Sequence, residues 1–476
     1  MNAIDNSAIL PSGFLSSVEQ ALGPRNVKTG ADVLAADPGW HPDNLRCGVV
    51  VYPGTTEQVA AVVRLCREHR IAIVPHGGKT GLVGGGISAA GEIVVSLERM
   101  NRIERLDTIE QVAVVEAGAI LQTLQEAAAE HGLTPGIDLA ARGSATIGGL
   151  VSTNAGGIMA FRNGVMRHRV LGLEAVLADG SVFSDLTRVV KNSAGYDLKH
   201  LFIGAEGTLG IVTRVAVKLE PVVPEAATAL FGLPSLAAAF ALLMRARALK
   251  SGELAACEAM WSGFFGFSAA NHGWSAQGYR TDNPVNLLLS FSGHDEARMS
   301  DEIAGLYETV LEQYPETEAV LASSLAQRDA LWRLREDTEQ IYSAYPAAPS
   351  YDVSVPLSET EAYVARLEER LRTVDPDLKP FIFGHIADGN LHIILNRAGG
   401  DMPAETLAAA EAVIYKDIRS LGGSFSAEHG VGSKRIHSLN ETADPVKLHW
   451  IGQMKRLIDP DNLFNPGKLV ARSDLS

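Results

Sequence analysis

Three glycine-rich segments in the first half of the chain constrain its fold more than any other feature. The first, 75–86 (PHGGKTGLVGGG), follows the β-type run Ile71–Val74, and the others cover 143–157 and 192–213. Glycine permits φ > 0 and a close backbone approach, so N–H groups in such loops can converge on an anion. The first loop has neither Walker nor Rossmann spacing. One such loop is equally typical of a flexible turn, but three together indicate a large, polar, phosphorylated ligand.

The elements around these loops indicate an α+β domain. Thr55–Arg67 has apolar residues at helical spacing behind a threonine that can cap, and Ile120–His131 ends at a glycine suited to a helix C-cap. Asp179-Gly180 predicts a type I′ hairpin turn. Further strands are expected at 93–97, 112–116 and 210–219. Helices mixed with hairpins are typical of an α+β fold rather than a regular doubly wound sheet.

A second domain is expected after the proline-rich stretch Pro221–Glu225. The chain has 476 residues, and single cores stop growing at about 250–300 residues. The apolar run Ala226–Met244 is interrupted by Gly232 and Pro234, which favours a buried strand, a turn and a helix capped by Ser235 over a membrane span. Later helices are expected at 235–250, 296–313, 359–374 and 404–421, with strands at 285–291, 381–385 and 391–396. We therefore predict domains 1–221 and 222–424 and a C-terminal segment 425–476 that returns to the first domain.

Charge and cysteine content exclude several classes of function. The formal net charge of -15 is a poor match for nucleic-acid phosphates or an anionic membrane. The three cysteines are far apart, which argues against a disulfide framework, an iron–sulfur cluster or a thiolate zinc site. The first residues lack the basic and apolar regions of a signal peptide and the arginines of a transit peptide. We expect a cytoplasmic protein with no membrane span.

The three glycine-rich segments resemble the FAD-binding domain of the vanillyl-alcohol oxidase and p-cresol methylhydroxylase superfamily, in its D-lactate and D-2-hydroxyglutarate dehydrogenase branch. The resemblance covers roughly 47–469. It implies a two-part FAD-binding domain of the p-cresol methylhydroxylase type and an antiparallel-sheet substrate (cap) domain backed by helices. Lys79, not histidine, follows the Gly-Gly pair, so we expect non-covalent FAD, although His76 precedes that pair. The FAD contacts that it implies are Pro75, Gly77, Gly78, Lys79, Thr80, Gly81, Ser144, Gly148, Asn154, Gly207, Ile211 and Asn465.

A second group of chemically active residues lies in the last quarter of the chain. Residues 381–395 (FIFGHIADGNLHIIL) predict a hairpin around Ala-Asp-Gly-Asn, with His385 opposite His392. Glu428, in SAEHGVG, is a third candidate ligand, and two histidines with one carboxylate are typical of open zinc or iron sites. On spacing alone, two ordinary sheet histidines and a surface carboxylate are the favoured interpretation, because cross-strand histidine pairs need no metal.

The resemblance favours the metal site, with His385, His392 and Glu428 as ligands of a divalent ion, expected to be zinc. It also implies that His429 is the acid/base and that Arg335 binds the substrate carboxylate. The partners would then be a small 2-hydroxy acid and an electron acceptor such as an electron-transfer flavoprotein, a quinone or a cytochrome; a homodimer is a candidate assembly. Ser350 replaces a lysine of hydroxyglutarate-specific relatives, and Glu339 a threonine, which puts a diacid substrate in doubt. The alternatives are a flavin oxidase that uses oxygen and a metal-dependent hydrolase without flavin.

Overall fold

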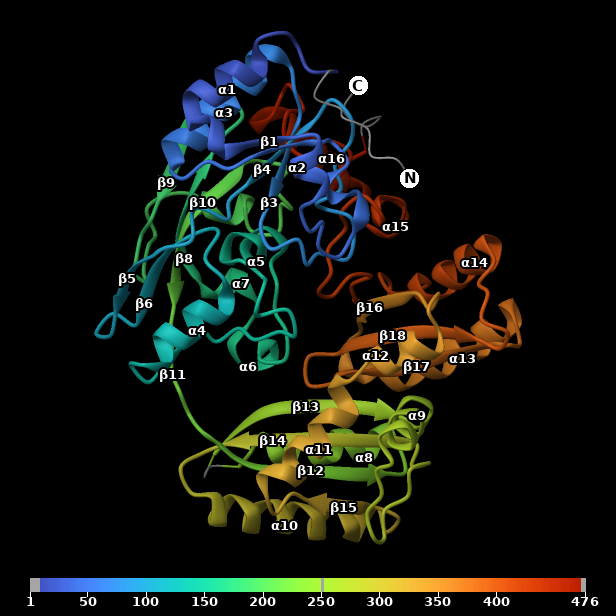
Figure 1. Ribbon diagram of the computed structural model, residues 1–476. Coiled ribbons are helices and arrows are strands. Elements are labelled where there is room, and N and C mark those ends of the chain that lie inside the picture. The colour runs from blue at the N-terminus through green and yellow to red at the C-terminus, as the bar shows by residue number, and fades with distance from the viewer. Residues whose placement is uncertain (1–8, 250–251, 472–476) are drawn as a thin grey trace. The chain divides into compact units, whose positions relative to one another are not determined.

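The computed structural model describes residues 9–249 and 252–471, in two compact units. Unit 1 takes in the chain up to Val222 and again from Glu428 onward, and unit 2 runs from Val223 to Ala427. Unit 2 is therefore inserted between two segments of unit 1. Figure 1 shows the course of the chain by colour.

Unit 1 contains two main sheets. The first has the strand order β1-β2-β4-β3, in which β2, β4 and β3 are parallel and β1 is antiparallel to β2. The second is antiparallel, in the order β5-β6-β10-β8-β9, and a two-stranded ladder joins β11 to β7. The strands are β1 (Val27–Thr29), β2 (Val49–Val51), β3 (Ile73–His76), β4 (Ile93–Ser96), β5 (Ile103–Asp107), β6 (Val112–Glu116), β7 (Leu133–Thr134), β8 (Val170–Val176), β9 (Val182–Asp185), β10 (Ile211–Lys218) and β11 (Glu220–Pro221).

Helices pack against the sheets and cover the hydrophobic core of unit 1. Helix α3 begins after Thr55, whose hydroxyl accepts a hydrogen bond from Gln58 N, and ends at Arg70 in the left-handed conformation. Helices α1 and α3 lie side by side against the four-stranded sheet (Figure 1), where Phe14 and Val59 are fully buried. The helices of the unit are α1 (Phe14–Leu22), α2 (Ala31–Leu34), α3 (Thr56–His69), α4 (Leu121–Ala129), α5 (Ile147–Thr153), α6 (Ala160–Asn163), α7 (Met166–Arg169), α15 (Ile436–Thr442) and α16 (Pro445–Ile458).

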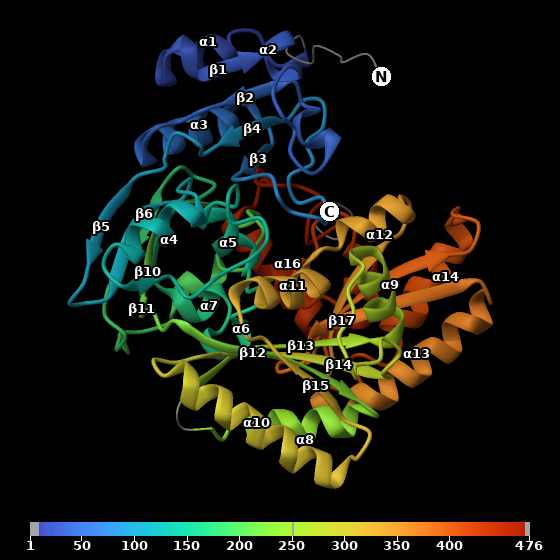
Figure 2. The same cartoon turned by 60° about the horizontal axis from the view of Figure 1, so that its bottom comes forward.

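Unit 2 is a seven-stranded sheet, antiparallel throughout, in the order β15-β12-β14-β13-β17-β18-β16. Its strands are β12 (Glu225–Leu233), β13 (Glu253–Trp261), β14 (Val285–Ser292), β15 (Glu318–Leu321), β16 (Ser350–Ser354), β17 (Leu378–His385) and β18 (Asn390–Arg397). Its helices are α8 (Leu236–Ala246), α9 (Ser262–His272), α10 (Glu296–Gln313), α11 (Leu325–Glu336), α12 (Glu339–Ala344), α13 (Thr360–Val374) and α14 (Ala404–Tyr415). Helices α8 and α10 lie side by side along the sheet (Figure 2), and α9 packs against β13 and β17. The expected antiparallel sheet backed by helices is confirmed.

Three local predictions differ from the structure, and one central strand was not predicted. The Asp179-Gly180 turn is not type I′: Val176 pairs with Val182, and Gly180, but not Asp179, has φ > 0. The helix expected at 404–421 ends at Tyr415, because Lys416 is extended and Asp417 has φ 68°. The helix expected to reach 250 ends at Ala246. Strand β13 was not expected, because its sequence, ELAACEAMW, carries two glutamates and no strict alternation.

Candidate active site

Unit 1 contains a cavity of about 650 Å³ between the glycine-rich segments. That volume is within the range of ordinary cofactor pockets. The cavity is also lined by Glu428 and His429 and, of the predicted contacts, by Pro75, Gly77, Gly78, Lys79, Thr80, Gly81, Ser144, Gly148, Gly207, Ile211 and Asn465. Asn154 is not among the lining residues, and its side chain instead accepts a hydrogen bond from Arg167 N at 2.9 Å.

The first glycine-rich loop lies directly on the second. It continues from β3, and a Cβ atom on Gly77 would lie 2.3 Å from Thr146 Oγ1. On Gly78 the Cβ atom would lie 1.9 Å from the backbone oxygen of Ser144. A side chain at Gly78 would require the backbone to move, and one at Gly77 would displace the Thr146 hydroxyl, so this wall of the cavity is main chain at the two glycines. Such a wall offers N–H groups to a phosphate without bulky side chains in the way.

Asn465 completes the cavity from the C-terminal segment. Its side-chain amide donates to Gly85 O at 3.0 Å and to the backbone oxygen of Glu206 at 2.8 Å. Its Oδ1 atom is buried and has no hydrogen-bond partner within the described residues. A buried acceptor in a cavity wall calls for a donor on the ligand, and the imide N–H of a flavin is such a donor. The residues present therefore fit FAD.

The C-terminal segment is fixed by a buried ion pair that the sequence analysis missed. Lys455 Nζ donates to Asp459 at 2.6 Å, to Phe464 O at 2.7 Å and to Thr208 O at 2.8 Å. Asp459 in turn accepts hydrogen bonds from the backbone N–H groups of Leu463 and Phe464. The backbone of Asn465 donates to Ile73 O at 2.7 Å, beside β3. The segment thus adds to the edge of the sheet from which the first loop begins.

Glu206 was also missed, and it holds the loop that carries Glu428 and His429. Its two carboxylate oxygens accept hydrogen bonds from Val431 N at 2.7 Å and Gly432 N at 2.6 Å. Burial raises the pKa of the Glu206 carboxyl, and these two hydrogen bonds oppose the rise. Glu206 has φ 52°, an uncommon conformation for a residue other than glycine. The sequence feature that could have identified Glu206 is the motif GAEGTLG, in which a single acidic residue stands among glycines.

His76 is buried in the wall of the same cavity. Its Nε2–H donates to Gly86 O at 2.7 Å. Burial lowers the pKa of His76 from 6.5 to about 4, so the imidazole is neutral at pH 7. Lys79, which follows the glycine pair, donates a hydrogen bond from Nζ to the backbone oxygen of Asp37 at 2.5 Å.

In unit 2, His385 and His392 lie together, but not in the register predicted. His392 pairs with Phe383, so His385 is its diagonal neighbour rather than its direct partner. The pairing of β17 with β18 ends at Phe383 because Ile386 N donates to Cys257 O on β13, and the turn takes in 386–389. The two-residue shift preserves the face of the sheet, and the imidazole centroids are 5.3 Å apart.

A buried carboxylate connects His385 to Arg335. Glu258, on β13, accepts a hydrogen bond from His385 Nδ1 at 2.7 Å through one oxygen and from Arg335 Nε at 2.7 Å through the other. Burial by itself would raise the pKa of the Glu258 carboxyl, but the charges and hydrogen bonds of His385 and Arg335 outweigh it and lower that pKa. Arg335 lies over the ring of Phe383 at 4.8 Å, and that ring stacks on Phe264 at 4.2 Å. Sequence reasoning did not identify Glu258, because β13 itself was not expected.

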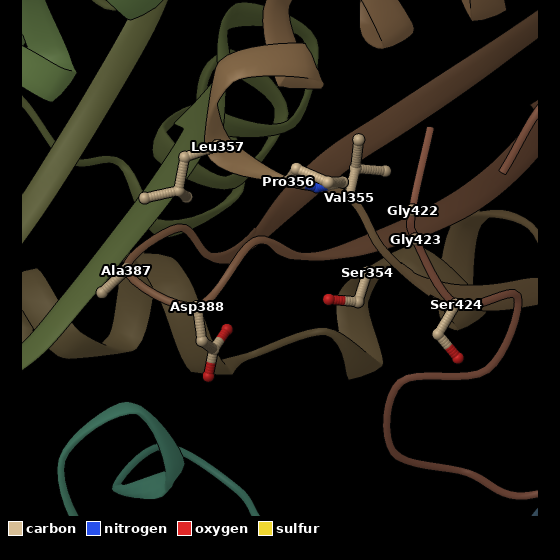
Figure 3. Close-up of a pocket in the computed structure, with 9 residues that line it drawn as sticks. All are labelled: Ser354, Val355, Pro356, Leu357, Ala387, Asp388, Gly422, Gly423 and Ser424. Atoms are coloured by element: carbon tan, nitrogen blue, oxygen red, sulfur yellow. The ribbon is translucent and has the colours of Figure 1, made fainter. Parts of the chain in front are cut away.

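A second, open cavity of about 380 Å³ lies beside the histidine hairpin in unit 2 (Figure 3). Figure 3 shows the carboxylate of Asp388 and the hydroxyls of Ser354 and Ser424 around it. Ser354 and Ser424 exchange two backbone hydrogen bonds, at 2.9 and 2.8 Å. This bridge fixes the chain four residues before Glu428.

Both halves of the chain match known families. Residues 48–185 match the model of the FAD binding domain, and residues 223–469 match that of the FAD linked oxidases, C-terminal domain. A D-2-hydroxyglutarate dehydrogenase of Xanthomonas citri is 37% identical over 441 residues, 91% of each chain. The mitochondrial D-2-hydroxyglutarate dehydrogenase of Bos taurus is 36% identical over 89% of this chain and 76% of its own. The chain belongs to the FAD-dependent 2-hydroxyacid dehydrogenases of the FAD-linked oxidase family.

Solved structures agree with the fold of this family. p-Cresol methylhydroxylase matches with a TM-score of 0.71 and 20% identity over 97% of each chain. Alkyldihydroxyacetonephosphate synthase matches with a TM-score of 0.71 and 16% identity over 96% of this chain and 84% of its own. The expected p-cresol methylhydroxylase-type fold is confirmed. Among the described residues, no helix combines the length and the apolar character that crossing a bilayer requires.

Proposed function

We propose that this dehydrogenase oxidises a small D-2-hydroxy acid to the 2-oxo acid. The observation that carries the proposal is in unit 2, where Arg335, expected to bind a carboxylate, and His385, expected to bind a metal, share one buried partner, Glu258. The D-2-hydroxyglutarate dehydrogenase relatives support the substrate class.

The oxidant in this proposal would be FAD held in the cavity of unit 1. Bound FAD would accept a hydride from the substrate carbon that carries the hydroxyl. The main-chain wall at Gly77 and Gly78 would hold the pyrophosphate, and Asn465 Oδ1 would accept from the isoalloxazine imide. FAD is expected to be held without a covalent bond, because Lys79 follows the glycine pair and His76 already donates to Gly86 O.

The proposed metal ligands are His385, His392 and Glu428. A divalent cation, with zinc as the expected ion, would lower the pKa of the substrate hydroxyl and orient the substrate. Within unit 2 the two imidazoles share a face, which supports the pair. Glu428 follows Ser424 by four residues, so its Cα lies within about 14 Å of that bridged position at full extension. This reach allows Glu428 to serve as the third ligand.

Two further groups of the chain act on the substrate in this proposal. Arg335 would bind the carboxylate through its terminal nitrogens, since its Nε–H is already donated to Glu258. His429 would accept the hydroxyl proton as the hydride departs, so that two electrons leave with the hydride and the proton goes to the imidazole. His429 lines the flavin cavity, as this role requires.

The side chain of the substrate is tested by comparing a monoacid with a diacid. The names of the relatives favour D-2-hydroxyglutarate. Ser350, at the start of β16, and Glu339, at the start of α12, bring no positive charge to a second carboxylate. We therefore expect D-lactate or another monocarboxylic acid to reduce the flavin at least as well as D-2-hydroxyglutarate. The reverse preference would show that another cation serves the distal carboxylate.

The test of function is flavin reduction without oxygen by D- and L-2-hydroxy acids, with metal analysis of the same protein. D-acids are expected to bleach the flavin, and chelation is expected to stop turnover while FAD remains bound. Full activity after chelation would remove the metal from the mechanism, and bleaching by L-acids alone would reverse the stereochemistry. Reoxidation by an acceptor dye, a quinone or an electron-transfer flavoprotein without peroxide formation would separate a dehydrogenase from an oxidase.

Variants assign the roles of single residues. His429→Gln is expected to keep FAD and metal and to lower the rate by ~10²–10⁴, the usual contribution of a general base. Arg335→Lys should raise KM, because lysine lacks the planar fork. Arg333→Lys, exposed on the same helix α11, is the matched control and should change neither constant. Unchanged KM in Arg335→Lys would remove the arginine from substrate binding.

A further inference from the structure

Glu258 occupies the centre of the seven-stranded sheet. It lies on β13, directly opposite His385 of β17, and only 1% of its surface is exposed. A carboxylate is almost never buried to this degree without partners, because removing its charge from water is costly. Its two partners are the histidine and the arginine that the proposed function uses for different purposes.

The hydrogen bond from His385 fixes which nitrogen can bind a metal. Nδ1 lies 2.7 Å from Glu258 Oε1. A carboxylate placed between two donors accepts from both, so Nδ1 carries the hydrogen and the lone pair is left on Nε2. The imidazole plane is set by the same bond, and its neighbour His392 lies on the same face of the sheet.

The hydrogen bond from Arg335 fixes which edge of the guanidinium faces a ligand. Nε donates to Glu258 Oε2 at 2.7 Å, and the ring of Phe383 covers one face of the guanidinium. Among the described residues, the side chain of Arg335 forms its hydrogen bond with Glu258. The two terminal nitrogens are then left to form the parallel pair of bonds that a carboxylate accepts.

We propose that Glu258 is a positioning residue that sets the carboxylate fork and the metal-binding imidazole at one fixed separation. The inference rests on the proposed function and deepens it. A 2-hydroxy acid carries its carboxylate and its hydroxyl on adjacent carbons. The arginine that binds the carboxylate and the metal that binds the hydroxyl must therefore lie at a short, constant distance from each other. One carboxylate that holds both protein groups provides that spacing from inside the sheet, without touching the substrate.

Glu258→Gln tests the inference, because glutamine keeps the size but offers only one acceptor atom, and its amide opposes the second donor. Zinc affinity is measured in the absence of substrate, by equilibrium dialysis of the FAD-loaded protein, and kcat and KM are measured with D-lactate. We expect metal affinity to fall 10- to 100-fold, as for other changes beside a metal-bound histidine. KM should rise in parallel, and FAD content should not change, because the flavin cavity belongs to unit 1.

Glu318→Gln is the matched control. Glu318 lies on β15 at the far edge of the same sheet and pairs with Arg280 at 2.9 Å. Its loss removes a carboxylate–arginine ion pair from the same sheet, at a more exposed position than Glu258, so a general loosening of the sheet would affect both variants. Glu258→Asp keeps the charge and should recover part of the metal affinity that Glu258→Gln loses.

Each outcome decides between the alternatives. Wild-type metal affinity and KM in a folded Glu258→Gln protein would overturn the inference and leave the proposed function standing. Equal losses in Glu318→Gln would also overturn it, in favour of a structural role. A wild-type protein that binds no metal would refute the metal site itself and the inference with it. If Glu258→Gln does not fold, Glu258→Asp decides, because unchanged affinity and KM there would contradict a carboxylate that must reach two groups.

Discussion

His76 makes the stability of unit 1 depend on pH in a way that can be calculated. The pKa of its imidazole falls from 6.5 to about 4 on folding, because burial disfavours the charged form. Below pH 6.5 the unfolded chain binds a proton that the folded chain refuses, so folding stability is lost as the pH falls from 6.5 toward 4. At 1.36 kcal/mol per pKa unit the full effect is about 3 kcal/mol, and between pH 7 and pH 5 it is about 2 kcal/mol.

The assay is urea unfolding of the flavin-loaded protein at pH 7 and pH 5, followed by the release of flavin fluorescence. His76→Gln retains an N–H donor for Gly86 O but cannot titrate, so it should lose about 2 kcal/mol less than wild type over this interval. His449→Gln, at an exposed position on α16, is the control and should behave as wild type. Identical pH dependence in wild type and His76→Gln would refute the reasoning, since it would mean that His76 is charged in the folded protein.

Three further predictions concern the same cavity. Lys455→Met leaves Asp459 buried without its cation and should lower the free energy of unfolding by about 3–5 kcal/mol in urea titrations; a change below about 1 kcal/mol would show that Asp459 is satisfied by backbone alone. Asn465→Ala should weaken FAD binding at least about tenfold, equivalent to about 1.4 kcal/mol, when FAD release is titrated; unchanged affinity would mean that its Oδ1 atom does not meet the flavin. Gly78→Ala should yield colourless protein because its Cβ would clash with the backbone at 1.9 Å, whereas Gly305→Ala on α10, with nothing within 4 Å, should stay yellow.

The sequence was informative where a local pattern has a single structural solution. Ser235 does cap α8, and α10 has the bounds that its periodicity predicted. The glycine-rich loops do surround one cavity, because their glycines allow backbone to pack on backbone.

The residues that the sequence analysis missed contact partners that are far away in the sequence. Glu258 and His385 are 127 positions apart, and Glu206 and Val431 are 225 apart. No periodicity relates such residues, and a glutamate in a mainly apolar strand gives no sign of its partners. The hairpin register was wrong for a similar reason, since the hydrogen bond from Ile386 goes to β13, a strand that the sequence did not predict.

The insertion of unit 2 within unit 1 also governs how the protein is made. During synthesis, residues 223–427 emerge completely before the last part of unit 1 exists. The edge of the four-stranded sheet must wait for Phe464, and the flavin cavity for Asn465. Because domains emerge in order from the ribosome at about 5–20 residues per second, unit 2 can fold first, while unit 1 waits for Phe464 and Asn465. Complete FAD binding therefore requires Asn465 to have emerged, and we expect a chain that stops before Asn465 to carry a folded second unit and to bind the flavin more weakly.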